Sequence, residues 1–112
     1  RKIVGEYISD SYQVRTNEHN GDMENVYSTL KITSKSVIMK MPGHGRTILN
    51  LVNSKILSWR QIDRNSLKLF LKEKVRGNLL DKYSLIIKKI RNRLEIITSD
   101  VPGINGLVWR NR

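Results

Sequence analysis

The chain has 112 residues, a formal net charge of +11 and no cysteine, with 38% hydrophobic and 28% charged residues. This length suits one domain with a single modest core, and the apolar content excludes a disordered chain. The lack of cysteine excludes a disulfide framework and a thiolate metal site. The sequence has no run of about 18 apolar residues, the length that a membrane-spanning helix needs. Because the first residue is Arg1, we expect residues 1–112 to be a single ligand-binding domain from a longer chain.

Short runs of alternating apolar and polar residues predict β-strands along the whole chain. The turn dipeptides between them, such as Asn53-Ser54 and Arg91-Asn92, predict hairpins between sequence neighbours. The fold class that follows is all-β, an antiparallel meander closing into a small eight- or nine-stranded up-and-down barrel. A long loop is expected at 15–25. The strands are expected at 3–14, 26–33, 36–41, 46–53, 55–62, 67–74, 82–90, 93–99 and 106–110.

Two strands show the alternation most clearly. The segment 26–33 places Val26, Ser28, Leu30 and Ile32 on one face, and the segment 67–72 places three leucines on one face. A period of two lays one side of a sheet on a core and leaves the other side solvated. The segment 79–94 also has apolar residues at helical spacing, so an amphipathic helix is an alternative there. Its aromatic and β-branched run at 83–87 favours strands.

The positive charge is concentrated in the middle of the chain. Residues 31–93 carry sixteen basic and three acidic side chains, a net charge of +13. Such a block attracts polyanions, so phosphate-bearing ligands, nucleic acid and anionic membranes are the partners to consider. The ordinary alternative is a solvated face, because Lys68, Lys72 and Lys74 alternate with the leucines and point away from the core.

Residues suited to catalysis are scarce. His19 and His44 are the only histidines, and no carboxylate pair or Ser-His-Asp arrangement is evident. Two histidines are too few for a zinc site without further ligands. We therefore expect a binding protein and not an enzyme, with no metal and no cofactor.

The segment 42–46, Pro-Gly-His-Gly-Arg, is a candidate anion-binding loop. Its glycines free the backbone to turn, and His44 and Arg46 offer donors suited to phosphate oxygens. The alternative is a glycine hairpin loop that happens to hold a histidine.

Both tryptophans precede an arginine, in Trp59-Arg60 and Trp109-Arg110. Aromatic rings stack on nucleobases and arginines bind phosphates, so both pairs are candidates for binding a nucleotide. Tyr7 is a further candidate for stacking. The alternative for each aromatic side chain is packing in the core.

The two ends of the chain resemble the lipocalin-like superfamily of small up-and-down barrels. Gly5-Glu6-Tyr7 stands where those families have Gly-x-Trp in the first strand. Arg110 stands where a last-strand arginine packs over that ring. The resemblance therefore implies a closed barrel in which Arg110 lies over Tyr7.

Within that architecture, the chain is similar to the barrel receptors of bacterial cyclic-oligonucleotide antiphage signalling. The similarity rests on Arg1-Lys2 at the start, the size of the barrel, and the basic centre with Gly45-Arg46 and Trp59-Arg60. It implies a cyclic dinucleotide ligand and homo-oligomerisation when the ligand binds. It also implies an upstream effector segment in the bacterial inner membrane, with the barrel in the cytoplasm.

Three functions remain open on the sequence. The first is a receptor domain for a cyclic dinucleotide or another phosphate-bearing small molecule. The second is a lipocalin-like carrier or lipoprotein domain for an apolar molecule. The third is binding of nucleic acid or an anionic membrane by the outer face, through Lys68, Lys72, Lys74, Lys88 and Lys89.

Overall fold

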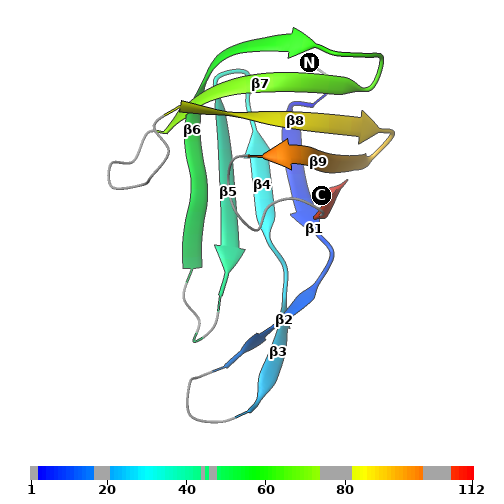
Figure 1. The fold of residues 1–112 in the computed structure, drawn as a ribbon. Helices are drawn as coiled ribbons and strands as arrows, with labels where there is room; N and C mark the ends of the chain where they lie inside the picture. Colours follow the sequence, from blue (N-terminus) through cyan, green and yellow to red (C-terminus); the bar gives the residue numbers. More distant parts are fainter. Residues whose placement is uncertain (1–2, 17–20, 44, 46–47, 74–81, 100–106) are drawn as a thin grey trace.

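The computed structural model describes residues 3–16, 21–43, 45, 48–73, 82–99 and 107–112. Its regular elements are all strands (Figure 1). No helix in these ranges is long and apolar enough to cross a membrane. The strands are β1 (Gly5–Ser9), β2 (Tyr12–Arg15), β3 (Met23–Val26), β4 (Thr29–Ile32), β5 (Ser36–Pro42), β6 (Ile48–Gln61), β7 (Ser66–Glu73), β8 (Lys82–Ile90), β9 (Arg93–Ser99) and β10 (Val108–Asn111).

Eight of these strands form a closed barrel in the order β1-β10-β9-β8-β7-β6-β5-β4, and β4 pairs with β1 to complete the ring. Every pairing is antiparallel. The expected small antiparallel barrel is therefore confirmed, with eight strands. This architecture is consistent with a lipocalin-like barrel.

The remaining strands, β2 and β3, form a two-stranded ribbon that projects from the barrel at the bottom of Figure 1. The expected strand at 3–14 is broken at Asp10 and Ser11, and part of the expected loop at 15–25 belongs to β3. The break is stabilised at Ser9, whose hydroxyl oxygen accepts a 2.8 Å hydrogen bond from the Ser28 backbone N–H. Beyond this point β1 and β4 no longer pair, and the chain continues as the ribbon.

The expected turn at Asn53-Ser54 is wrong, because β6 runs through it without interruption. Val37 of β5 and Glu73 of β7 both pair with Ser54, so this residue lies inside the sheet. The chain bends at bulges instead of at a turn, and β6 pairs with β5 over its first half and with β7 over its second half. The helical alternative for 79–94 is also wrong over its described part, where β8 pairs with both β7 and β9.

The inward positions of the strands form one apolar core. On β4, the buried residues Leu30 and Ile32 confirm the alternation expected there, and Leu69 and Leu71 do so on β7. Trp109 is the largest fully buried side chain. The buried cluster also contains Ile3, Tyr7, Val37, Met39, Tyr83, Leu85, Ile87, Leu94 and Ile96. Side chains thus fill the middle of the barrel, as expected for an eight-stranded barrel of this size.

The core holds one polar pair whose effect can be measured. The hydroxyl groups of Tyr83 and Ser54 are hydrogen-bonded and both residues are buried. Burial raises the pKa of Tyr83 to about 12, the Ser54 hydrogen bond opposes this rise, and the charge of Glu73 adds to it. Because the unfolded chain releases this proton near pH 10, the stability contributed by neutral Tyr83 is complete below pH 10 and is lost as the pH rises toward 12.

We expect the titration of Tyr83 to lower the free energy of unfolding by roughly 2 kcal/mol between pH 9.5 and 11.5. Tyr83→Phe removes the titrating group, so its unfolding free energy should fall less over the same interval. Urea titrations of both proteins at the two pH values test this. Equal losses in the two proteins would show that Tyr83 does not titrate with folding. At neutral pH the variant should be less stable by about 1 kcal/mol, because Ser54 loses its partner.

Candidate functional site

The end of the barrel where β6 turns into β7 and β8 turns into β9 has an open pocket. Its volume is about 660 Å³, within the range of small-molecule sites. It is lined by Ile3, Trp59, Gln61, Arg64, Asn65, Leu67, Lys89 and Arg91. We call it the mouth pocket.

Strand register brings Trp59 and Gln61 to the mouth pocket. Trp59 is opposite Leu69, and Gln61 is opposite Leu67. Opposed residues of an antiparallel pair share a face of the sheet, and this face carries the buried leucines of β7. Both side chains therefore belong to the inner face. Trp59 is still 42% exposed because it lies where the barrel opens to solvent.

Lys89 reaches the pocket by the same alternation. It follows the buried residues Leu85 and Ile87 at intervals of two, and it is opposite the buried Leu94. Its ammonium group lies 5.4 Å from the centre of the Tyr7 ring. The expectation that Lys89 is on the outer face with Lys88 is therefore wrong: neighbouring residues of a strand point to opposite faces, and Lys89 is the inward one.

The β6–β7 turn holds two further lining residues at the rim. The Asp63 carboxylate accepts a 2.9 Å hydrogen bond from the Asn65 backbone N–H, and this bond is the main reason that the pKa of Asp63 is lowered. The backbone N–H of Lys89 donates to the Asn65 carbonyl oxygen at 2.9 Å. That bond ties the turn to β8, so Arg64 and Asn65 are held beside Lys89.

Arg91 stands in the two-residue turn between β8 and β9 with φ of 57°. This left-handed conformation favours glycine, and a long side chain there carries a cost of about 1 kcal/mol. Backbone strain of this kind is often found at functional sites. The turn brings an arginine to the rim of the mouth pocket at a position where glycine would be the more stable choice.

The lining of the mouth pocket has three basic residues, Arg64, Lys89 and Arg91, and no acidic residue among the described ones. Gln61 and Asn65 add amide donors and acceptors, and Ile3 and Leu67 add apolar surface. The pocket thus combines a half-exposed indole ring with a positive rim. A ligand that suits it has a flat aromatic part and a negative part.

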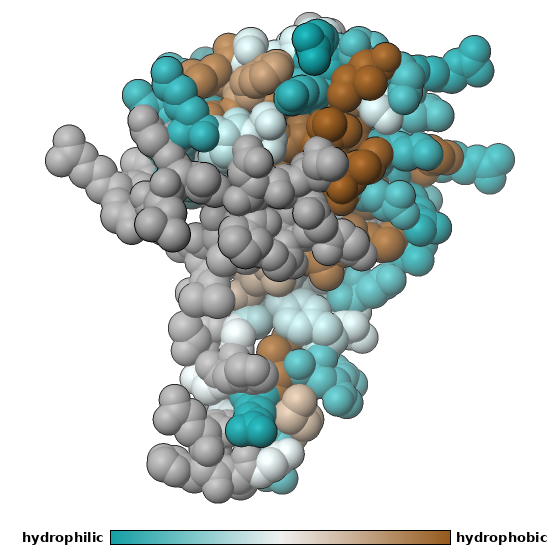
Figure 2. All heavy atoms as spheres, viewed as in Figure 1, coloured by the Kyte–Doolittle hydropathy of each residue, from teal (hydrophilic) through white to brown (hydrophobic). Residues whose placement is uncertain are grey.

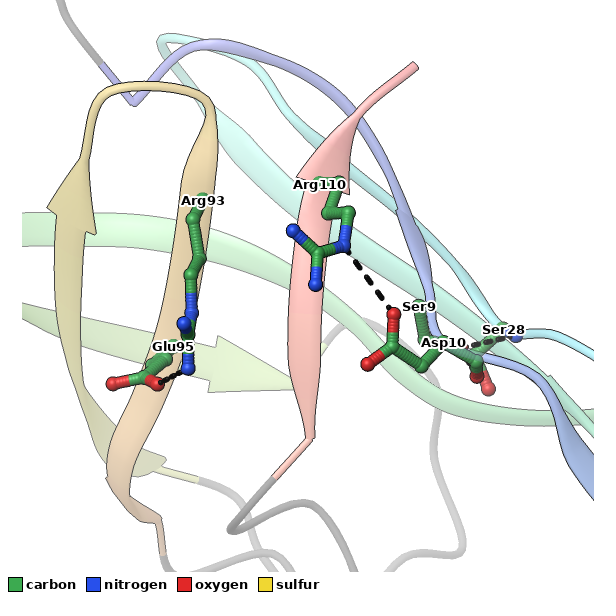
Figure 3. A network of polar contacts seen from close by, with 6 residues as sticks. All are labelled: Ser9, Asp10, Ser28, Arg93, Glu95 and Arg110. Carbon is green, nitrogen blue, oxygen red and sulfur yellow. Dashed lines mark hydrogen bonds and ion pairs between the residues drawn. The ribbon is translucent and has the colours of Figure 1, made fainter.

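A second hollow of about 420 Å³ lies on the outer face of β8 and β9 and extends to β10. It shares Arg91 with the mouth pocket, and its two other arginines have carboxylate partners: Arg93 contacts Glu95 at 2.7 Å, and Arg110 contacts Asp10 at 3.4 Å (Figure 3). It has no aromatic lining residue among the described ones. The mouth pocket is therefore the better candidate site for an anionic ligand with an aromatic part.

Of the described residues proposed from the sequence as nucleotide contacts, Trp59 alone lines the mouth pocket. Tyr7 and Trp109 are fully buried in the core, and the Tyr7 hydroxyl donates a 2.7 Å hydrogen bond to the Ile3 carbonyl oxygen. Arg60 is opposite Lys68 on the outer face, so Trp59 and Arg60 point to opposite sides of the sheet. His44 and Arg46 lie outside the described residues.

The expected packing of Arg110 over Tyr7 is wrong. Asn111 is opposite Tyr7, and Arg110 is opposite Ile8, which places Arg110 on the outer face near Asp10 (Figure 3). The cation over the Tyr7 ring is Lys89, from β8.

Sequence reasoning missed the cations of the mouth pocket. The sequence predicts a turn at Arg91-Asn92, but it does not show that this turn lies at the same end of the barrel as Arg64. The inward position of Lys89 could have been predicted from the two-residue alternation of the strand, because Lys89 follows Leu85 and Ile87 at intervals of two. Comparisons with protein-family models, with curated proteins and with solved structures gave no match to this chain.

Proposed function

We propose that this domain binds a nucleotide at the mouth of its barrel. A base lies against the indole of Trp59, and phosphates are held by Arg64, Lys89 and Arg91. The observation that carries this proposal is the presence of a half-exposed tryptophan and three cations in one pocket. Aromatic rings stack on nucleobases, and guanidinium and ammonium groups donate charge-assisted hydrogen bonds to phosphate oxygens. Nucleotides present a flat base and phosphate together.

The amide side chains of the pocket support a base-bearing ligand. The Asn65 amide offers donor and acceptor atoms and Gln61 offers its carbonyl oxygen, which suits the edge of a nucleobase. The Gln61 amide nitrogen donates to the Asp63 carbonyl oxygen, which orients that side chain. Leu67 and Ile3 supply apolar surface on which a ring can rest.

Within this class, a cyclic dinucleotide is the ligand we propose to test first. Two phosphates in one small ring need several cations close together, and the mouth pocket has three. The resemblance to receptors of antiphage signalling favours the same ligand. In that role the domain senses a second messenger in a bacterium, and a membrane-bound effector segment outside residues 1–112 responds when liganded barrels associate.

The part of the chain that the structure describes gives no observation in favour of an apolar carrier. Such a carrier needs free space among the inward side chains, and here Trp109, Tyr7 and Met39 are fully buried in the middle of the barrel. The mouth pocket has a basic rim, which a neutral apolar molecule would not use.

The two tryptophans make the proposal directly testable. Trp59 is 42% exposed and Trp109 is 0% exposed, so acrylamide should quench the fluorescence of Trp59 alone. A panel of cyclic dinucleotides, their linear counterparts, ATP and palmitate is titrated by calorimetry, and acrylamide quenching is measured with each compound. We expect one or more nucleotides to bind and to protect Trp59 from the quencher.

Trp59→Ala should weaken nucleotide binding by about 5- to 100-fold, the value of one stacked base, and Trp59→Phe should retain most of the affinity. Melting temperatures measured without ligand show whether each variant is folded. Binding of palmitate with no response to any nucleotide would overturn the proposal in favour of a carrier. Unchanged nucleotide affinity in Trp59→Ala would place the ligand elsewhere.

A further inference from the structure

The outer face of β6, β7 and β8 carries rows of directly opposed cations. Lys55 of β6, Lys72 of β7 and Lys82 of β8 are opposite one another in consecutive pairs, and all three are exposed. Strands lie about 4.8 Å apart, so each neighbouring pair in this row is close. Arg60 and Lys68 form a second like-charged pair on the same face.

Within β6, β7 and β8 as the structure describes them, no acidic side chain lies on this outer face. β6 and β8 contain no acidic residue, and the one carboxylate of β7 belongs to Glu73, which is opposite the buried Ser54 on the inner face. Like charges placed directly opposite on a sheet destabilise it, and a row of three is unfavourable for folding alone. The row therefore presents a concentrated positive charge to solvent.

Apolar side chains lie beside the charged rows. The β-bulge of β6 against β7 inserts Leu57, and the β-bulge of β9 against β8 inserts Ile97. Both side chains are 47% exposed. Phe70 and Ile86, at outward positions of β7 and β8, are only partly buried. Figure 2 looks onto the side of β7–β9 and shows apolar side chains at the surface in the upper part of the molecule, with hydrophilic ones beside them. We call these residues and the charged rows the basic–apolar face.

We propose that the basic–apolar face docks on an anionic lipid membrane. Lysines near such a surface are attracted to acidic headgroups, and exposed aliphatic and aromatic side chains are removed from water when they enter the interface. Nucleic acid accounts for the lysines but gives the exposed Leu57 and Ile97 no partner. This face is separate from the mouth pocket, so the inference does not depend on nucleotide binding.

The test is co-sedimentation with vesicles of phosphatidylcholine alone and of phosphatidylcholine with 30% phosphatidylserine. We expect binding to the anionic vesicles only. Lys55→Gln/Lys72→Gln/Lys82→Gln should weaken it by about 100-fold, since each lysine contributes roughly a five-fold factor. The matched control is Lys31→Gln/Lys40→Gln/Arg112→Gln, which removes the same charge from exposed positions outside the face and should change binding far less.

A second variant separates the lipid surface from nucleic acid. Leu57→Gln/Ile97→Gln keeps every charge and should weaken vesicle binding several-fold, with no effect on association with a DNA duplex. Equal losses of vesicle affinity in the lysine variant and its control would show that binding depends on net charge alone, and would overturn the proposal. So would binding to the duplex with no binding to anionic vesicles. Thermal unfolding of each variant confirms that it is folded before its binding is compared.

Discussion

Trp109→Ala is expected to lower the free energy of unfolding by about 3–5 kcal/mol. The side chain is 0% exposed, and it is opposite the buried Leu94 on β9 and next to β1 in the closed ring. Its removal leaves a large cavity where the last strand joins the first. Because domains of this size are stable by only about 5–15 kcal/mol, a large share of the stability is lost. Urea unfolding followed by circular dichroism measures the change.

Two other tryptophan variants serve as controls for this prediction. Trp109→Phe keeps most of the apolar volume and removes the indole Nε1, which has no hydrogen-bond partner among the described residues, so its cost should be much smaller. Trp59→Ala removes a half-exposed side chain and should cost less than about 1 kcal/mol. Similar losses for Trp59→Ala and Trp109→Ala would contradict the division into a core and a mouth tryptophan.

Arg64→Gln/Lys89→Gln/Arg91→Gln is expected to reduce nucleotide affinity by at least about 100-fold. Hydrogen bonds to charged groups are worth about 1.5–3 kcal/mol each, and this variant removes all three cations that line the mouth pocket. Calorimetric titration with the best nucleotide of the panel measures the loss. The matched control is Lys88→Gln/Arg93→Gln/Arg110→Gln, which removes three cations from the outer hollow and should leave most of the affinity.

Arg91→Gly separates loss of binding from loss of folding. Glycine adopts the left-handed conformation of this turn without strain, so the variant should be as stable as the parent protein or more stable by about 1 kcal/mol. Its nucleotide affinity should nevertheless fall, because one cation of the rim is lost. Unchanged affinity in Arg91→Gly together with equal losses in the triple variant and its control would show that the ligand does not use this rim.

The alternation of residues was sufficient to predict most of the barrel. Ser28, Leu30 and Ile32 are buried on one face of the chain at 28–32, as expected from their spacing. Local sequence pattern was insufficient where strands bend. Asn53-Ser54 has the composition of a turn, but it lies within β6 and is paired with the neighbouring strands. Composition describes local preference, and the neighbouring strands decide whether that preference is expressed.

The candidate site was only partly predictable for a related reason. Trp59 was identified from its chemistry, whereas Lys89 was expected on the outer face and lies at the mouth. Arg64 and Arg91 are 27 positions apart in the sequence and line one pocket because two hairpin turns lie at the same end of the barrel. The resemblance suggested that Arg110 covers Tyr7, but the register of β10 turns Arg110 outward.

The sequence by itself determined that this protein is a small basic all-β domain, because a period of two and frequent turn dipeptides are local properties of the chain. The tertiary structure alone decided that the ring closes between β1 and β4 with eight strands, and that the cations divide between the mouth pocket and the basic–apolar face. The physical reason is register. A shift of one residue in strand pairing moves a side chain from one face to the other, and contacts between distant strands set that register.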